Sequence, residues 1–128
     1  MIVSDTNIFL AVVLEEPEKD GIIHLTSGAD VVSPEILPYE LGNALAAMVK
    51  RRQLDGREAL QAYEAANSIP VRLAAVDIRQ ALKLALEYNI YAYDAYFLQC
   101  ALQFSAPLIT LDKRMKQVAE DLKIGIVE

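Results

Sequence analysis

The 128-residue sequence has one cysteine, one histidine and no apolar run near the roughly 20 residues that a membrane helix requires. A lone cysteine excludes an internal disulfide, so we expect a reducing compartment, most simply the cytoplasm. The first residues lack the charged start, apolar stretch and cleavage site of a secretory signal. The single histidine, His24, lies among isoleucines and leucine, so we interpret it as structural and expect no histidine-based acid–base catalysis.

An excess of positive charge is also absent. The net charge of −6 argues against a protein that coats nucleic acid generally. It does not exclude a nuclease, because a metal site uses several acids while local basic clusters still hold phosphates. Apolar residues make up 54% of the chain, more than in an average domain. This surplus suggests an interface with a second copy or with a protein partner.

Short apolar runs alternate with segments of helical period along the whole chain. We expect five strands, at residues 2–5, 31–32, 70–76, 108–110 and 125–127. Helices are expected over residues 7–14, 18–27, 33–52, 55–67, 78–88, 93–104 and 113–122. There is no repeat, linker or low-complexity segment. The pattern predicts one domain, residues 1–128, of the α/β class: a mostly parallel five-stranded sheet between two layers of helices.

Four carboxylates stand where solvated acids are unusual. Asp5 and Asp112 each close an apolar strand, and Glu40 and Asp94 lie within apolar helical stripes. An isolated buried carboxylate takes up a proton or finds a cation, and none of these four has a basic neighbour at the same depth. The strand-end acids share one edge of a parallel sheet, and the helical acids belong to early turns that dock on that sheet. The sequence therefore predicts a metal site.

Each acid also has a purely structural interpretation. Asp5 and Asp112 could cap the helices that follow them, and Asp94 could cap a helix starting at Ala95. Glu40 could reach solvent at the edge of its helix. One metal site accounts for all four positions together, whereas the structural alternative requires four separate explanations.

A series of short motifs carries a family resemblance. In chain order they are Asp5-Thr6-Asn7, Ser33-Pro34-Glu35, Tyr39-Glu40-Leu41-Gly42-Asn43-Ala44-Leu45, Tyr93-Asp94-Ala95 and Thr110-Leu111-Asp112. This ordered set spans essentially the whole chain and resembles the PIN-domain ribonucleases, at this size most closely the VapC-type toxins of toxin–antitoxin modules. The resemblance implies a five-stranded parallel sheet flanked by helices, and an endoribonuclease that depends on Mg²⁺ or Mn²⁺.

The resemblance also implies roles for particular residues. It places catalytic, metal-binding carboxylates at four positions, with the first and third as the main direct ligands: Asp5, Glu40, Asp94 and Asp112. Asn7 and Thr110 match its supporting polar positions. The expected partners are an RNA substrate, a cognate antitoxin and a second copy of the chain, with no membrane.

The sequence supports weaker predictions about the roles of residues outside these motifs. Lys113 and Arg114 follow the last acid and are candidates for contacts with substrate phosphates, although they could simply charge a helix face. We interpret the basic residues 50–52 as helix-end charges, and Cys100 as a core residue. The tyrosines of segment 91–96 could stack on unpaired bases but are more typical of a core.

Two other functions stay open from the residues alone. A metal-dependent phosphatase or receiver-like phosphoryl enzyme would need paired aspartates at the first strand, which Asp5-Thr6-Asn7 matches poorly. A non-catalytic PIN-like interaction module would usually have lost some of the four acids. The sequence therefore favours the endoribonuclease. In that chemistry a bound divalent ion lowers the pKa of its water and polarises a phosphoryl oxygen, and some nucleases use a second ion about 4 Å away.

Overall fold

Four parallel strands form the sheet: β1 (Ile2–Ser4), β2 (Val31–Pro34), β3 (Arg72–Ala74) and β4 (Leu108–Ile109). In the computed structural model, which describes residues 1–128, their order is β3-β2-β1-β4. The chain first builds the sheet outward from β1 through β2 to β3, then returns to place β4 on the other side of β1. The strand order therefore reverses between β1 and β4, and ligands of such sheets bind beyond the carboxyl ends of the strands at this point.

The predicted fifth strand is wrong. Residues 125–127 lie beside β4 but form only an isolated bridge, between Leu108 and Ile126. Two backbone hydrogen bonds make this bridge, from Leu108 N to Gly125 O (2.8 Å) and from Val127 N to Leu108 O (3.0 Å). Because β4 itself has two residues, there is no room for a longer ladder, and the sheet has four strands.

Seven helices connect and cover the strands. They are α1 (Thr6–Val13), α2 (Lys19–Thr26), α3 (Leu37–Lys50), α4 (Gly56–Asn67), α5 (Ile78–Tyr88), α6 (Ala92–Phe104) and α7 (Lys113–Asp121). Asp55 and Glu58 form a capping box at the start of α4. Helix α3 starts later than predicted, because Ser33 and Pro34 pair with β3 instead of opening a helix. No helix combines the length and the apolar character needed to cross a membrane.

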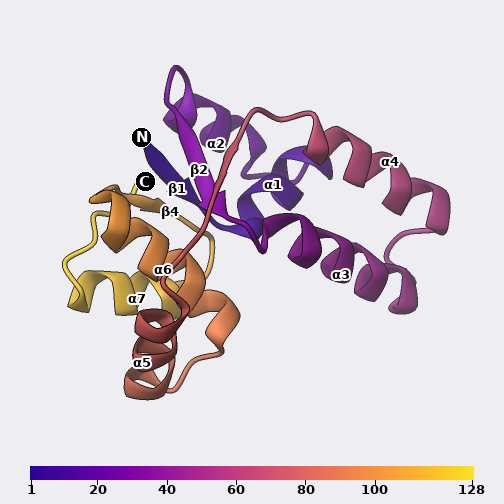
Figure 1. Ribbon diagram of the computed structural model, residues 1–128. Coiled ribbons are helices and arrows are strands. Elements are labelled where there is room, and N and C mark those ends of the chain that lie inside the picture. Colours follow the sequence, from indigo (N-terminus) through magenta and orange to yellow (C-terminus); the bar gives the residue numbers. More distant parts are fainter.

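The two faces of the sheet are covered by different helices (Figure 1). Alternate strand residues Val3, Val32 and Leu108 pack with residues of α5, α6 and α7 in the largest core cluster. Ile2 and Ile109 point the other way and pack against α1 and α2. This arrangement confirms the three-layer prediction, because successive residues of a strand face opposite sides. Helices α3 and α4 form a hairpin that projects away from the sheet (Figure 1).

Candidate active site

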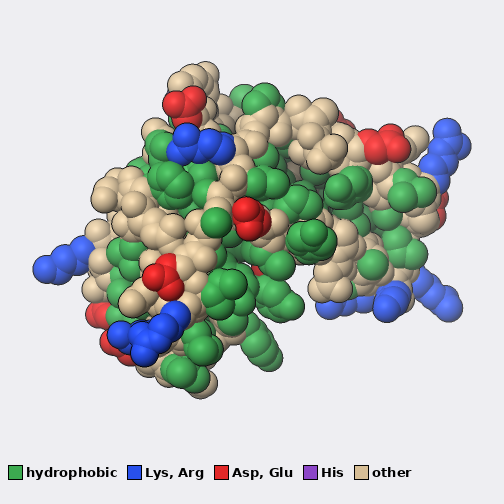
Figure 2. Space-filling view, viewed as in Figure 1, with side chains coloured by type: hydrophobic (Ala, Val, Ile, Leu, Met, Phe, Trp, Pro, Cys, Tyr) green, Lys and Arg blue, Asp and Glu red, His purple; other side chains and the backbone are tan.

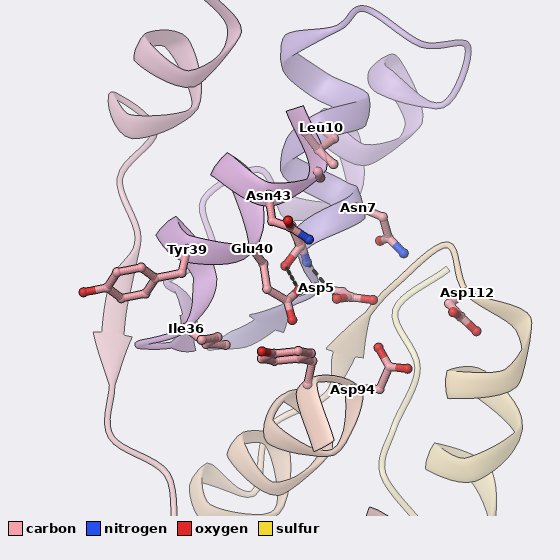
Figure 3. Close-up of a pocket in the computed structure, with 12 residues that line it drawn as sticks. Asp5, Asn7, Leu10, Ile36, Tyr39, Glu40, Asn43, Asp94 and Asp112 are labelled. Atoms are coloured by element: carbon pink, nitrogen blue, oxygen red, sulfur yellow. Dashed lines mark hydrogen bonds between the residues drawn. The ribbon is translucent and has the colours of Figure 1, made fainter. Parts of the chain in front are cut away.

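All four predicted carboxylates line one open cleft, which lies beyond the carboxyl ends of β1 and β4 (Figure 3). The cleft has a volume of about 500 Å³. Asp5 follows β1 directly and Asp112 follows β4 after two residues, while the first turns of α3 and α6 supply Glu40 and Asp94. The fold thus gathers residues from both ends of the chain at the point where the strand order reverses.

Asp5 lies deepest in the cleft. Only 5% of the residue is exposed, and both carboxylate oxygens accept hydrogen bonds. Oδ1 accepts from the backbone N–H of Thr6 and Oδ2 from the hydroxyl of Thr110, each at 2.7 Å. Burial raises the pKa of Asp5 to about 7; the two hydrogen bonds oppose this rise, and the charges of Asp94 and Glu40 add to it. Asp5 therefore caps α1, as the structural interpretation proposed, and still faces the other acids.

Glu40 and Asp94 are half-buried and come from the first turns of α3 and α6. The hydroxyl of Thr6 donates to Oε2 of Glu40 at 2.8 Å. Burial raises the pKa of Glu40, Thr6 lowers it, and the charge of Asp94 raises it further. Burial also raises the pKa of Asp94, with a contribution from the charge of Asp112. The alternative in which Asp94 caps a helix from Ala95 is wrong, because α6 begins at Ala92.

Asp112 both caps α7 and lines the cleft. Its Oδ1 accepts from the backbone N–H of Met115 at 3.0 Å, which makes it the N-cap of α7. The same residue lines the cleft and raises the pKa of Asp94 through its charge. The capping interpretation is therefore correct for its local geometry, but it does not remove the carboxylate from the site.

One hydroxyl connects the strand-end residues. Thr110 Oγ1 donates to Asp5 and accepts from the backbone N–H of Asp112 at 3.0 Å and from Asn7 Nδ2 at 3.4 Å. The side-chain oxygen of Asn7 in turn accepts from the N–H of Leu111 at 3.2 Å. The predicted supporting residues thus tie the loop after β4 to the start of α1.

Sequence reasoning missed two polar residues of the cleft. Thr6 holds Glu40, and Asn43 lies on α3 one turn after Glu40. Thr6 had a signal, since a hydroxyl beside a strand-end acid is placed to bond neighbouring carboxylates. Asn43 shares the helical stripe of Glu40 and stands in the same motif, and these were its signals in the sequence.

The acids of the cleft have no basic partner. The two ion pairs of the structure, Lys19 with Glu15 and Lys116 with Glu128, both lie elsewhere on the surface. No three His, Cys, Asp or Glu side chains stand close enough together to hold an ion directly. Mg²⁺ retains several waters and binds proteins through one or two carboxylates, so an all-oxygen set of spaced, uncompensated acids fits a partly hydrated hard ion.

Other predicted residues lie outside the cleft. Lys113 and Arg114 are exposed on the first turn of α7, and Arg114 donates to the carbonyl of Tyr88 at 2.8 Å. Cys100 is fully buried in the core as predicted, and burial raises the pKa of its thiol to about 11. His24 is exposed on α2 and does not line the cleft. Of the three tyrosines in segment 91–96, only Tyr93 lines the cleft.

The raised pKa of Asp5 predicts how stability depends on pH. The folded protein holds this proton up to about pH 7, whereas the unfolded chain releases it near 3.8, so stability is lost as pH rises through this interval. In chelator, wild type should be about 2 kcal/mol less stable at about pH 8 than at about pH 5.5 by urea denaturation. Asp5→Asn should remove most of this difference; an equal difference in the variant would contradict the assignment.

Carboxylates gathered where the strand order of a parallel α/β sheet reverses define a class of candidate hydrolytic sites. Similarity to known proteins shows the family to which this chain belongs. The PIN domain family model matches residues 2–121, so the chain belongs to the PIN-domain family. PIN domains are generally nucleases. No curated protein matches the chain significantly.

Three crystal structures have a similar fold at low sequence identity. PAE2754 from Pyrobaculum aerophilum has 18% identity and a TM-score of 0.72, covering 91% of this chain and 83% of its own. FitAcB from Neisseria gonorrhoeae has 20% identity and a TM-score of 0.69, covering 100% and 97%. VapBC2 from Rickettsia felis, bound to a DNA fragment from its promoter, has 16% identity and a TM-score of 0.68, covering 100% and 98%.

Proposed function

We propose that the protein is a metal-dependent endoribonuclease, with Mg²⁺ or Mn²⁺ as its cofactor and the four carboxylates as its catalytic, metal-binding residues. The observation that carries this proposal is the cleft itself: four acids, three of them with raised pKa values, share one cleft with no lysine, arginine or histidine in an ion pair. A divalent cation supplies the missing charge and, when bound, lowers the pKa of water and polarises a phosphoryl oxygen. Membership of the PIN-domain family supports the same chemistry.

The chain's own residues prepare the site for this reaction. Asp5 and Asp94 are the main candidates to bind the ion, and Glu40 and Asp112 would complete the acidic set. Thr6 orients Glu40, and Thr110 orients Asp5, so both hydroxyls favour the ionised forms that bind a cation. Burial of Asp5 excludes water from its oxygens and strengthens its interaction with a bound cation.

RNA cleavage tests the proposal directly. Purified protein should cut unpaired or structured RNA with Mg²⁺ or Mn²⁺ and stop cutting in chelator, and Asp94→Asn should reduce the rate by at least about 100-fold. Asp20→Asn is the matched control, because this exposed residue of α2 lies outside the cleft. Equal cutting by wild type and Asp94→Asn, or cutting that persists in chelator, would refute the proposed mechanism.

Metal binding should also appear in thermal stability. An ion that binds the folded cleft and not the unfolded chain stabilises by about 2.7 kcal/mol at 100 times its dissociation constant. Saturating Mg²⁺ or Mn²⁺ should therefore raise the melting temperature of wild type and Asp20→Asn by several degrees, and that of Asp94→Asn much less. The prediction fails if the three proteins shift equally, since that pattern would indicate binding away from the cleft.

We further propose that the protein acts in the cytoplasm as the toxin of a VapBC-type pair, with a cognate antitoxin and a homodimeric assembly. The support is similarity in fold to FitAcB and VapBC2 over the whole chain. Expression of wild type should arrest growth, Asp94→Asn should not, and co-expression of a small protein encoded beside the gene should restore growth. A stable complex of the two proteins on size exclusion would identify that protein as the antitoxin; wild-type expression without growth arrest would exclude the toxin role.

A further inference from the structure

The end of the α3–α4 hairpin carries a concentrated positive charge. Four of the chain's 12 Lys and Arg residues lie there: Lys50, Arg51, Arg52 and Arg57. All four are exposed, and none belongs to an ion pair. Figure 2 shows Lys and Arg side chains gathered at this end of the hairpin. In a chain of net charge −6, these four residues, here called the basic end, form a local excess of positive charge.

The two acidic residues in this segment, Asp55 and Glu58, are hydrogen-bonded to backbone groups. Asp55 Oδ1 accepts from the N–H of Glu58 at 2.7 Å, and Glu58 Oε1 accepts from the N–H of Asp55 at 3.0 Å. These reciprocal bonds form the capping box of α4, so both carboxylates bind backbone groups instead of the neighbouring cations. The four basic side chains remain available to an external anion.

A helix-end role does not explain the whole cluster. Lys50 and Arg51 stand at the carboxyl end of α3, where the helix dipole favours a cation. Arg57 instead lies in the first turn of α4, where the same dipole disfavours one. The interpretation of residues 50–52 as helix-end charges therefore does not account for Arg57.

The exposed face of α3 joins the basic end to the cleft. Asn43 lines the cleft, and Lys50 follows it by seven residues, or two helical turns, so both lie on one face. The residues between them on this face, Ala46 and Ala47, have small side chains that leave it unobstructed. At 1.5 Å per residue, Lys50 lies about 15 Å beyond Glu40 along the helix.

We propose that the basic end binds the phosphate backbone of the RNA substrate, whose strand follows the exposed face of α3 away from the cleft. This inference rests on the proposed ribonuclease function. The carboxylates of the cleft repel phosphates, so attraction has to come from a separate surface that does not disturb the metal site. Exposed lysine and arginine side chains supply it without reading sequence, because phosphate contacts position a strand and base contacts specify it.

RNA affinity measured without cleavage tests this surface. In chelator, the Kd of wild type for a short fluorescent unpaired RNA is compared with that of a triple variant, Lys50→Gln, Arg51→Gln and Arg52→Gln. The control triple, Arg79→Gln, Lys83→Gln and Lys123→Gln, removes the same charge from exposed positions elsewhere. The two triples are closely matched, since Arg52 and Lys123 both have left-handed backbone, with φ of 60° and 61°.

The hairpin triple should weaken RNA binding by about tenfold, and its slope of log Kd against log salt, between about 50 and 200 mM, should fall by about two units. The control triple should change both much less. Equal losses in the two triples would reduce the effect to net charge and overturn the proposal, as would unchanged binding by the hairpin triple. Cleavage is scored separately: a protein that binds RNA through this surface and cuts none would refute the nuclease function and leave the surface standing.

Discussion

Replacing Asp5 with asparagine should reduce RNA cleavage by at least about 1,000-fold and at the same time stabilise the metal-free protein. The loss of activity follows from removal of the deepest carboxylate of the cleft, because several kcal/mol of charge stabilisation at the phosphoryl group correspond to this factor. The gain in stability follows from burial, which raises the pKa of Asp5 to about 7 and so makes its ionised form costly at higher pH. Asparagine keeps the shape without the charge.

The measurement is urea denaturation in chelator at about pH 8, alongside cleavage with Mn²⁺. Asp5→Asn should be more stable than wild type by about 1–3 kcal/mol, less than the full electrostatic cost because the amide replaces one acceptor oxygen with a donor facing Thr110. Addition of metal should reverse the order, since only wild type gains from binding. An inactive variant that is also destabilised would indicate damage to the fold and would contradict this account.

The strand-end acids could be placed from the sequence, and the contacts among them could not. Asp5 and Asp112 follow apolar strands, and parallel strands end at a common edge, so their convergence follows from the alternation of strands and helices. Glu40 and Asp94 followed from helical spacing alone. The bond from Thr6 to Glu40 joins residues 34 positions apart, and its partner depends on how α3 lies across the sheet. Helical period gives the face of a helix, but not its position relative to other elements.

Two errors about the fold have the same physical origin. Residues 125–127 have the composition of a strand, but strand formation requires a partner of sufficient length, and β4 has two residues. Ser33 and Pro34 suit the start of a helix, yet β3 offers them backbone partners and extends β2 instead. In both cases a local preference is decided by a neighbour distant in sequence, which no local pattern contains.

The cleft places like charges together at a cost in stability. Asp94 and Glu40 both raise the pKa of Asp5, and Asp112 raises that of Asp94. A protein selected only for stability would place a basic side chain among them or replace one with an apolar residue. Retention of all four, with hydroxyls that favour the charged forms of two, is consistent with a cation as the missing component.

The hydroxyl of Thr110 is the connection on which the geometry of the strand-end acids depends. It is 2% exposed and contacts three groups: the carboxylate of Asp5, the backbone N–H of Asp112 and the amide of Asn7. The bond to Asp5 lowers a pKa that burial raises, so its loss should make Asp5 harder to ionise and the metal harder to bind. Outer hydrogen-bond partners of metal ligands typically contribute 10–100-fold to affinity or activity, on the order of 1–3 kcal/mol.

Thr110→Val should therefore lower apparent metal affinity and cleavage by about 10–100-fold while keeping the volume of the side chain. It should also destabilise the protein by about 2 kcal/mol in chelator, because the partly buried N–H of Asp112 and amide of Asn7 lose an acceptor. Thr110→Ser keeps the hydroxyl and is the matched control, with activity close to wild type. Cleavage titrated with Mn²⁺ separates the two effects: rate recovered at high Mn²⁺ indicates weakened metal binding, because a purely structural defect would not respond to the ion. Equal behaviour of the valine and serine variants would contradict this role, because only the serine variant retains the hydroxyl.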